Sequence, residues 1–154
     1  MIVLDENLDE QRVRMPLADR YRGKVVSVRE LRTGSVIKDE AEPTILCQHR
    51  NATFVTTNVS DFWRRAPAHA RYCIVCVPLP TERQDELPDL LFRLLRHATF
   101  RTARGRMGKV IRASRSKILY YKSGERAVVK VGSKPASARP ERFTEGNEVN
   151  EELN

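Results

Sequence analysis

Runs of β-branched and aliphatic residues alternate with helical segments along the first part of this chain, and this alternation limits the possible folds more than any other feature. The apolar runs are Met1–Leu4, Lys24–Val28, Ala52–Asn58 and Arg71–Leu79. Helices are expected from Leu8 to Met15–Pro16 or just beyond, from Pro43 through His49, and over Thr81–His97. Strands alternating with helices predict an α/β fold with a mainly parallel sheet covered on both faces.

The clearest helical pattern is TERQDELPDLLFRLLRH, residues 81–97. Its apolar positions recur at helical spacing, and they are Leu87, Leu90, Leu91, Leu94 and Leu95. Thr81 belongs to a residue type favoured at N-caps, and the acids that follow it suit the positive end of a helix dipole. We therefore expect Thr81 to cap this helix.

The C-terminal part of the chain has a different character. KVIRAS, KILYY and RAVVKV are strand-like, and KSGE between the last two indicates a β-hairpin. Residues 132–154 are polar and poor in apolar side chains, which predicts a disordered tail. We expect one domain over residues 1–131, in which residues 109–131 form a basic β-hairpin extension.

Charge indicates the class of partner. The chain of 154 residues has a net charge of +8 and a pI near 9.8, which favours a polyanion such as nucleic acid. No apolar run is long enough to cross a bilayer and no apolar signal core begins the chain, so we expect no membrane and a cytoplasmic location. Three cysteines, an odd number, fit a reducing compartment. Cys73 and Cys76 lie within one strand and point to opposite faces, which favours buried strand residues over a zinc site.

Much of the positive charge lies in one stretch, since no acidic residue occurs between Asp89 and Glu125. Such a stretch can neutralise phosphates. The predicted RNA-binding residues are Arg101, Arg104, Arg106, Lys109, Arg112 and Arg115. The same stretch also suits a solvated face or a surface that pairs with an acidic protein, and the sequence alone leaves these alternatives open.

Acidic and amide residues follow three of the predicted strands. Asp5 and Asn7 follow the first, Asp39 and Glu40 the second, and Asn58, Ser60 and Asp61 the third. Since ligands of parallel sheets bind beyond the carboxyl ends of the strands, these groups can converge there. Clustered carboxylates would hold a hard cation, Mg²⁺ or Mn²⁺. The same residues also suit helix N-caps, which is the competing interpretation.

Four segments in order resemble the compact PIN-like proteins related to VapC-type ribonuclease toxins. They are MIVLDENL, DEA followed after one residue by PTIL, TFVTTNVSDF and ARYCIVCV, within about residues 1–121. GKVIRASRSKILYY is similar to the C-terminal extension of one subgroup. The resemblance implies a PIN-like three-layer α/β/α fold and metal-dependent RNA cleavage by carboxylates. By position, Asp5 matches the first acid, and Asp39 or Glu40 matches the acid that opens the following helix.

The third motif departs from the pattern. Relatives commonly carry Thr-x-Asp-x-Asp-Phe, and here Val59 stands where the metal-site Asp is expected. Valine cannot bind a cation, so Asp61 or Asn58 would have to replace it. The resulting prediction is a Mg²⁺- or Mn²⁺-dependent site of Asp5, Asp39, Glu40 and Asp61, supported by Asn7, Asn58 and Ser60.

Two functions follow from the resemblance and the charge. One is a divalent-metal-dependent ribonuclease, such as the toxin of a toxin–antitoxin pair, with RNA and an antitoxin protein as partners. The alternative is a catalytically weak or inactive PIN-like module that binds RNA or a protein. The oligomeric state stays open.

Overall fold

The computed structural model describes residues 1–31, 42–125 and 127–131, with only the backbone of Glu42. Asp39, Glu40 and the predicted tail, residues 132–154, lie outside the described residues. Within the described ranges, no helix combines the length and the apolar character needed to cross a membrane.

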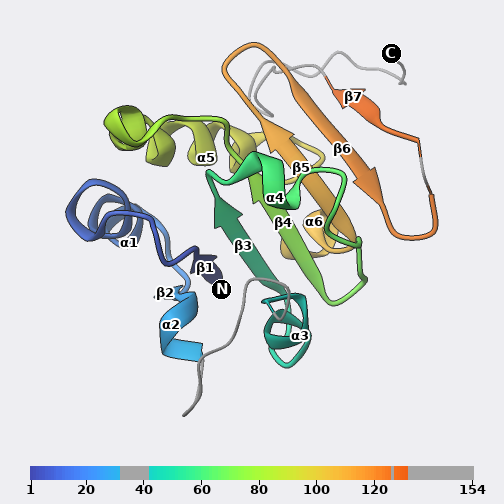
Figure 1. Ribbon diagram of the computed structural model, residues 1–154, viewed down its shortest axis with the longest axis horizontal. Coiled ribbons are helices and arrows are strands. Elements are labelled where there is room, and N and C mark those ends of the chain that lie inside the picture. Colours follow the sequence, from blue (N-terminus) through green and yellow to red (C-terminus); the bar gives the residue numbers. More distant parts are fainter. Residues whose placement is uncertain (32–41, 126, 132–154) are drawn as a thin grey trace.

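The described residues form a seven-stranded sheet in the order β2-β1-β3-β4-β5-β6-β7 (Figure 1). The strands are β1 (Ile2–Leu4), β2 (Val25–Ser27), β3 (Ala52–Thr56), β4 (Tyr72–Cys76), β5 (Lys109–Ala113), β6 (Ile118–Lys122) and β7 (Val129–Val131). β1 to β5 pair in parallel, and β6 and β7 are antiparallel. The predicted mainly parallel α/β sheet is confirmed, and β5 extends its parallel part.

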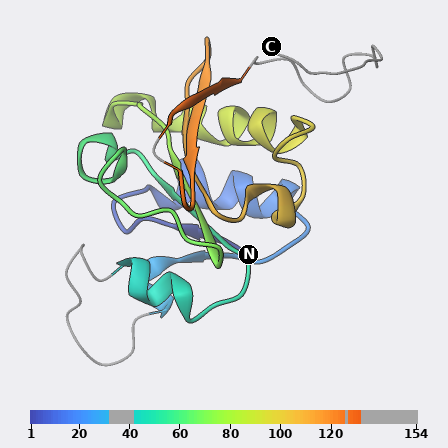
Figure 2. The ribbon, with the colours of Figure 1, turned by 90° about the vertical axis from the view of Figure 1, so that its right-hand side faces the viewer.

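Helices cover both faces of the sheet. On one face lie η1 (Glu10–Arg14), α1 (Met15–Arg20) and α5 (Leu87–Arg96), and on the other lie α2 (Val28–Leu31), α3 (Glu42–Cys47) and α4 (Val59–Phe62). The 3₁₀ segment η3 (Thr81–Glu86) contacts η1 and leads into α5. A short helix, α6 (Ala103–Arg106), precedes β5. Figure 2 shows α5 and α6 to one side of the sheet and α4 to the other. The arrangement is consistent with three α/β/α layers.

The central strands are apolar because both of their faces are covered. All five residues of β3 and of β4 are buried. One core, between the sheet and α1 and α5, contains Leu17, Leu91 and Val75. The second core, between the sheet and α2, α3 and α4, contains Phe62 and Phe54. We call the sheet face against this second core the α4 face.

Two helix boundaries differ from the prediction. Thr81 is not an N-cap, because it begins a 3₁₀ turn that Pro80 precedes without a side-chain capping bond. The α-helix proper begins only at Leu87, next to Pro88, which has no N–H to lose in a first turn. Pro16 likewise lies in the first turn of α1, which follows a π-helical turn and continues to Arg20.

Candidate active site at the carboxyl edge of the sheet

The strand order places a topological switch point between β1 and β3. The chain passes from β1 to β2 on one side and then crosses to β3 on the other. In doubly wound α/β sheets with the order 2-1-3-4-5, ligands bind beyond the carboxyl ends of the strands at this switch point. The residues that follow β1 and β3 therefore define the candidate site.

Asp5, which follows β1, is held rigidly there. The residue is buried, with 7% of its surface exposed. Its Oδ1 accepts a hydrogen bond from the Glu6 N–H at 2.7 Å, and its Oδ2 accepts one from the Thr56 hydroxyl at 2.6 Å. The Asp5 N–H also donates to the Val55 carbonyl oxygen, which prolongs the pairing of β1 with β3. A buried carboxylate with these donors has a fixed orientation.

Thr56 links Asp5 to the segment that follows β3. Its Oγ1 accepts a hydrogen bond from the Asn58 N–H at 2.9 Å. The Asn58 Nδ2 donates to Asp61 Oδ2 at 2.7 Å, while the Asn58 Oδ1 caps α4 through the Asp61 N–H and accepts from the Ser60 hydroxyl. The structure therefore connects four of these polar residues, Asp5, Asn58, Ser60 and Asp61, through Thr56. Sequence reasoning missed Thr56 because its position resembles that of any buried strand residue.

The remaining predicted residues are placed differently. Asn7 is exposed, and its carbonyl oxygen accepts a hydrogen bond from Gln84. Val59 is the first residue of α4 and packs against the second core. Within the described part of the chain, no three Asp, Glu, His or Cys side chains form a group that could hold a metal ion. Asp39 and Glu40 lie outside that part.

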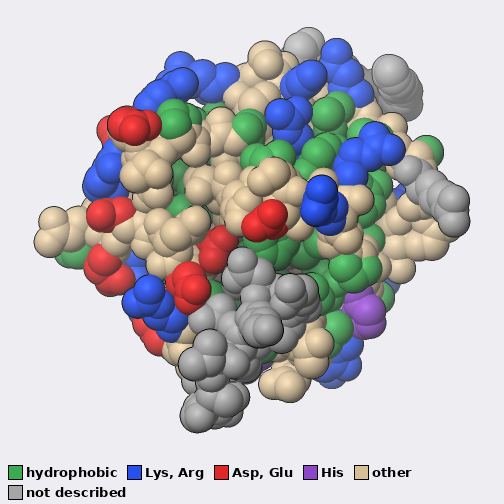
Figure 3. Space-filling view, viewed as in Figure 1, with side chains coloured by type: hydrophobic (Ala, Val, Ile, Leu, Met, Phe, Trp, Pro, Cys, Tyr) green, Lys and Arg blue, Asp and Glu red, His purple; other side chains and the backbone are tan. Residues whose placement is uncertain are grey.

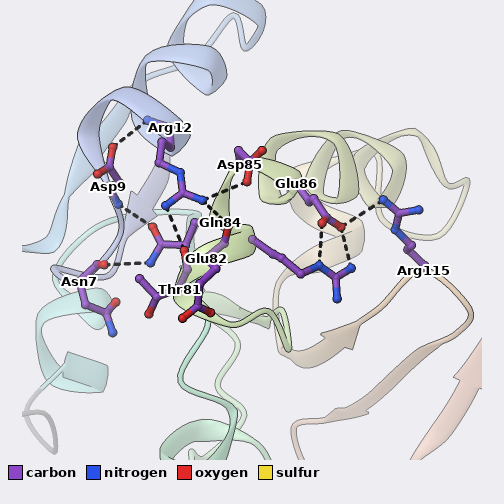
Figure 4. Close-up of polar contacts among 10 residues, drawn as sticks. Asn7, Asp9, Arg12, Thr81, Glu82, Gln84, Asp85, Glu86 and Arg115 are labelled. Atoms are coloured by element: carbon purple, nitrogen blue, oxygen red, sulfur yellow. Dashed lines mark hydrogen bonds and ion pairs between the residues drawn. The ribbon is translucent and has the colours of Figure 1, made fainter.

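Gln84 fixes the loop after β1 through Asn7 and Asp9, as Figure 4 shows. The buried Gln84 side chain accepts a hydrogen bond from the Asp9 N–H at 2.9 Å and donates to the Asn7 carbonyl oxygen at 3.3 Å. Arg12 donates to the carbonyl oxygens of Thr81 and Glu82 in the same region. The loop after β1 is thus tied to the segment after β4, an arrangement for which the sequence holds no local signal.

An ion-pair group centred on Glu86 joins the end of η3 to the segment after β5 (Figure 4). Glu86 accepts two hydrogen bonds from Arg83, at 2.7 and 2.9 Å, and one from Arg115 at 3.1 Å. The hydrogen bonds and charge of Arg83, followed by those of Arg115, lower the pKa of Glu86 to about 2. Arg115 therefore has part of its charge balanced within the protein.

The basic stretch does not form one surface. β5 runs parallel to β1, so Lys109 at its start lies at the amino edge of the sheet, together with the preceding α6 and its exposed Arg104. Arg101 is exposed just before α6. Arg112 and Arg115 lie at the other end of β5, on the same edge as Asp5. The predicted RNA-binding residues thus separate into two groups.

Arg106 is a correction to the predicted set. Only 4% of its surface is exposed, and its guanidinium donates to Thr53 Oγ1 at 3.1 Å and to the Phe100 carbonyl oxygen at 2.8 Å. A side chain enclosed in this way cannot reach RNA. The Lys109 ammonium is also half-buried, donates to the Gly105 carbonyl oxygen, and has a pKa lowered mainly by desolvation.

The prediction for Cys73 and Cys76 is confirmed. Both thiols are unpaired and buried in β4, and burial raises the pKa of each to about 12. Neither is a reactive thiolate at neutral pH.

The fold and this edge define a doubly wound α/β protein with a buried acid at its switch point. Comparisons of the chain with protein-family models, with curated proteins and with solved structures found no match.

Proposed function

We propose that this protein is a PIN-like, divalent-metal-dependent ribonuclease that hydrolyses RNA phosphodiester bonds at the carboxyl edge of β1 and β3. The observation that carries the proposal is the buried Asp5 carboxylate at the switch point, oriented by Thr56 and linked to Asn58 and Asp61. The ordered resemblance of the motifs to PIN-like ribonucleases and the net positive charge support the same function.

The donor atoms at this edge fit Mg²⁺ or Mn²⁺. Asp5, Asn58 and Asp61 offer only oxygen ligands from their side-chain carboxylate and carbonyl groups, which are the ligands that these hard cations prefer. Mg²⁺ needs only one or two protein carboxylates, because it keeps several waters. Asp39 or Glu40 is the second acid that the resemblance assigns. When bound, the metal supplies an activated water and stabilises negative charge on the phosphate.

The chain's own residues would prepare that chemistry. Thr56 and the Glu6 N–H hold the Asp5 carboxylate in one orientation, and Gln84 keeps the loop around it in place. Preorganisation of this kind lowers the cost of binding a charged group and of placing the scissile phosphate.

A specific observation favours the alternative, a module that binds RNA or a protein without cleaving. Val59 replaces the expected third acid and packs against the apolar core, so at this position the chain has a structural side chain instead of a metal ligand. The nearby Asp61 is exposed and hydrogen-bonded to Asn58. The ribonuclease and the binding module differ in whether the protein cleaves RNA when a divalent metal is added.

A metal-titrated cleavage assay separates them. We expect weak wild-type cleavage that requires Mg²⁺ or Mn²⁺ and falls by more than about a hundredfold in Asp5→Asn, a larger loss than outer-shell contacts usually cause. Val59→Asp should raise the rate by adding a ligand, and Asp61→Asn should lower it. Asp19→Asn, which changes an exposed acid on α1, is the matched control and should cleave like the wild type.

The outcomes are distinct. Cleavage that survives both chelation and Asp5→Asn would rule out the metal mechanism. Absence of cleavage with every metal, together with unchanged RNA affinity in Asp5→Asn, would favour the binding module. Asp39→Asn and Glu40→Gln, assayed in the same way, test which of the two supplies the second acid.

A further inference from the structure

The register of the strands places Arg112 in one row with Asp5. Thr56 pairs with Cys76, and Cys76 pairs with Arg112. Leu4 pairs with Val55, so Asp5 and Thr56 stand next to each other at the start of this row. Three strand spacings separate β1 from β5, which is roughly 14 Å.

All members of the row lie on the α4 face. Side chains alternate along a strand, and Val3, Phe54, Cys76 and Val110 all belong to the second core. Asp5, Thr56 and Arg112 lie two residues beyond Val3, Phe54 and Val110, respectively. The buried acid and the arginine therefore share one edge and one face of the sheet.

Arg112 differs from Arg106, whose buried guanidinium has two acceptors inside the protein. The Nε of Arg112 is buried and has no hydrogen-bond partner among the described residues. None of the ion pairs between described residues involves Arg112. The neighbouring Cys76 thiol provides no negative charge, because burial raises its pKa to about 12. A guanidinium is permanently charged, and leaving one of its donors buried and unpaired costs free energy. Buried donors without a partner are uncommon in native proteins, and a bound water, ion or ligand is among the groups that complete them.

The surroundings of Arg112 suit a single-stranded nucleic acid. Leu119 of β6 pairs with Arg112, and beyond it the exposed Lys130 of β7 continues the row. Tyr121, two residues from Leu119 on the same face, contacts Trp63 with ring centroids 5.2 Å apart. Both aromatic side chains are partly exposed. Figure 3 shows this side of the molecule, where Lys and Arg side chains gather over β5, β6 and β7. Basic groups beside aromatic rings are typical of surfaces that bind single strands.

We infer that Arg112 binds a backbone phosphate of single-stranded RNA that crosses the carboxyl edge of the sheet on the α4 face, between Asp5 and Lys130. The planar fork of a guanidinium matches phosphate oxygens, and Arg112 as a whole is only half-buried, so the outer nitrogens of its guanidinium are the donors that a phosphate can reach. This inference rests on the proposal that RNA is the ligand, and it does not require cleavage. If the RNA lies along the carboxyl edge, then the amino edge, where Arg101 and Arg104 lie, is not the main RNA-binding surface.

The test is a binding titration of a labelled short oligouridylate in EDTA, repeated over a series of salt concentrations. Arg112→Met should weaken binding about tenfold, as expected for one lost charge-assisted hydrogen bond. It should also reduce the slope of log affinity against log salt by about 0.7, the contribution of one phosphate contact on a single strand. Arg112→Lys keeps the charge without the fork and should lie between the wild type and Arg112→Met.

Arg104→Met is the matched control, because it removes the same charge from the opposite edge. We expect it to weaken binding by less than about threefold. Thermal unfolding provides a second readout. Since the Nε of Arg112 has no partner among the described residues, Arg112→Met should leave the midpoint unchanged or raise it, which separates ligand binding from a structural role.

Three results would overturn the inference. They are an equal loss in Arg104→Met and Arg112→Met, a lowered unfolding midpoint in Arg112→Met, and no binding by the wild type at low salt. If binding depends on Arg112 while no metal supports cleavage, the inference holds and the proposed ribonuclease activity fails.

Discussion

Thr56 is the residue whose substitution tests the candidate site most directly. Its side chain is fully buried, and its hydroxyl donates to Asp5 Oδ2 while accepting from the Asn58 N–H. Thr56→Val removes both hydrogen bonds and leaves the shape of the side chain and its preference for a β-strand almost unchanged. The variant therefore measures the contribution of the hydroxyl alone, because the packing of β3 changes little.

The expected cost follows from the groups left without partners. A hydrogen bond to a charged group contributes about 1.5–3 kcal/mol, and the unpaired Asn58 N–H adds about 1 kcal/mol. We expect Thr56→Val to destabilise the protein by roughly 2.5–4 kcal/mol, a large part of the 5–15 kcal/mol typical of a whole domain. Thr56→Ser keeps the hydroxyl and loses one methyl group, which costs only about 1 kcal/mol.

Urea unfolding measures the difference in stability between Thr56→Val and Thr56→Ser. With a slope of about 2 kcal/mol per molar urea, the midpoint should fall by roughly 1–2 M in Thr56→Val and by about 0.5 M in Thr56→Ser. In the Asp5→Asn background, Thr56→Val should cost about 1 kcal/mol less, because the charged acceptor is gone. A Thr56→Val variant at least as stable as Thr56→Ser would refute the reasoning, since apolar burial alone predicts that order.

Two further predictions concern ionisable groups. Because Arg83 and Arg115 hold the pKa of Glu86 near 2, below its ordinary 4.5, the carboxylate favours the folded state at neutral pH, and this contribution disappears as the pH falls from about 4.5 through 2. Glu86→Gln should lower the thermal midpoint by a few degrees at most at pH 7 and not at pH 2, and an equal effect at both values would contradict the ion pairs. A thiol reagent at pH 8 should modify the partly exposed Cys47 in the folded protein, and Cys73 and Cys76 only after denaturation. The Cys47→Ser variant should then stay unlabelled while folded, and rapid labelling of it would show that β4 opens readily.

The parts of the fold that were predictable are those set by local periodicity. The runs around β1, β3 and β4 are mostly apolar because both faces of the sheet are covered there, and that pattern is visible in the sequence. The KSGE turn likewise indicates the β6–β7 pairing. Thr81 and Pro16 show where local rules fail. A threonine before acids looks like a cap, yet the backbone first makes a 3₁₀ turn and α5 starts beside its own proline.

The candidate site was predictable only in part, because its geometry depends on contacts between distant residues. The positions of Asp5 and Asn58 follow from strands that end in polar residues. The hydroxyl that joins them belongs to Thr56, and the amide that holds the loop belongs to Gln84, which lies 77 residues from Asn7. Nothing in the local pattern distinguishes either residue from its neighbours. Such contacts become visible only when strand order and register are known.

Arg106 and Arg112 show why the net charge of +8 is an incomplete guide to function. The two arginines lie six positions apart in one acid-free stretch, and sequence reasoning treats them alike. The fold gives Arg106 two acceptors inside the protein. Its guanidinium therefore joins α6 to β3 and to the Phe100 carbonyl oxygen by hydrogen bonds. The fold gives the Arg112 Nε no acceptor among the described residues and places that side chain in the same row as Asp5. The paired donors of Arg106 carry no such penalty, whereas the unpaired Nε of Arg112 costs stability, so only Arg112 has a position that its contacts within the described residues leave unexplained.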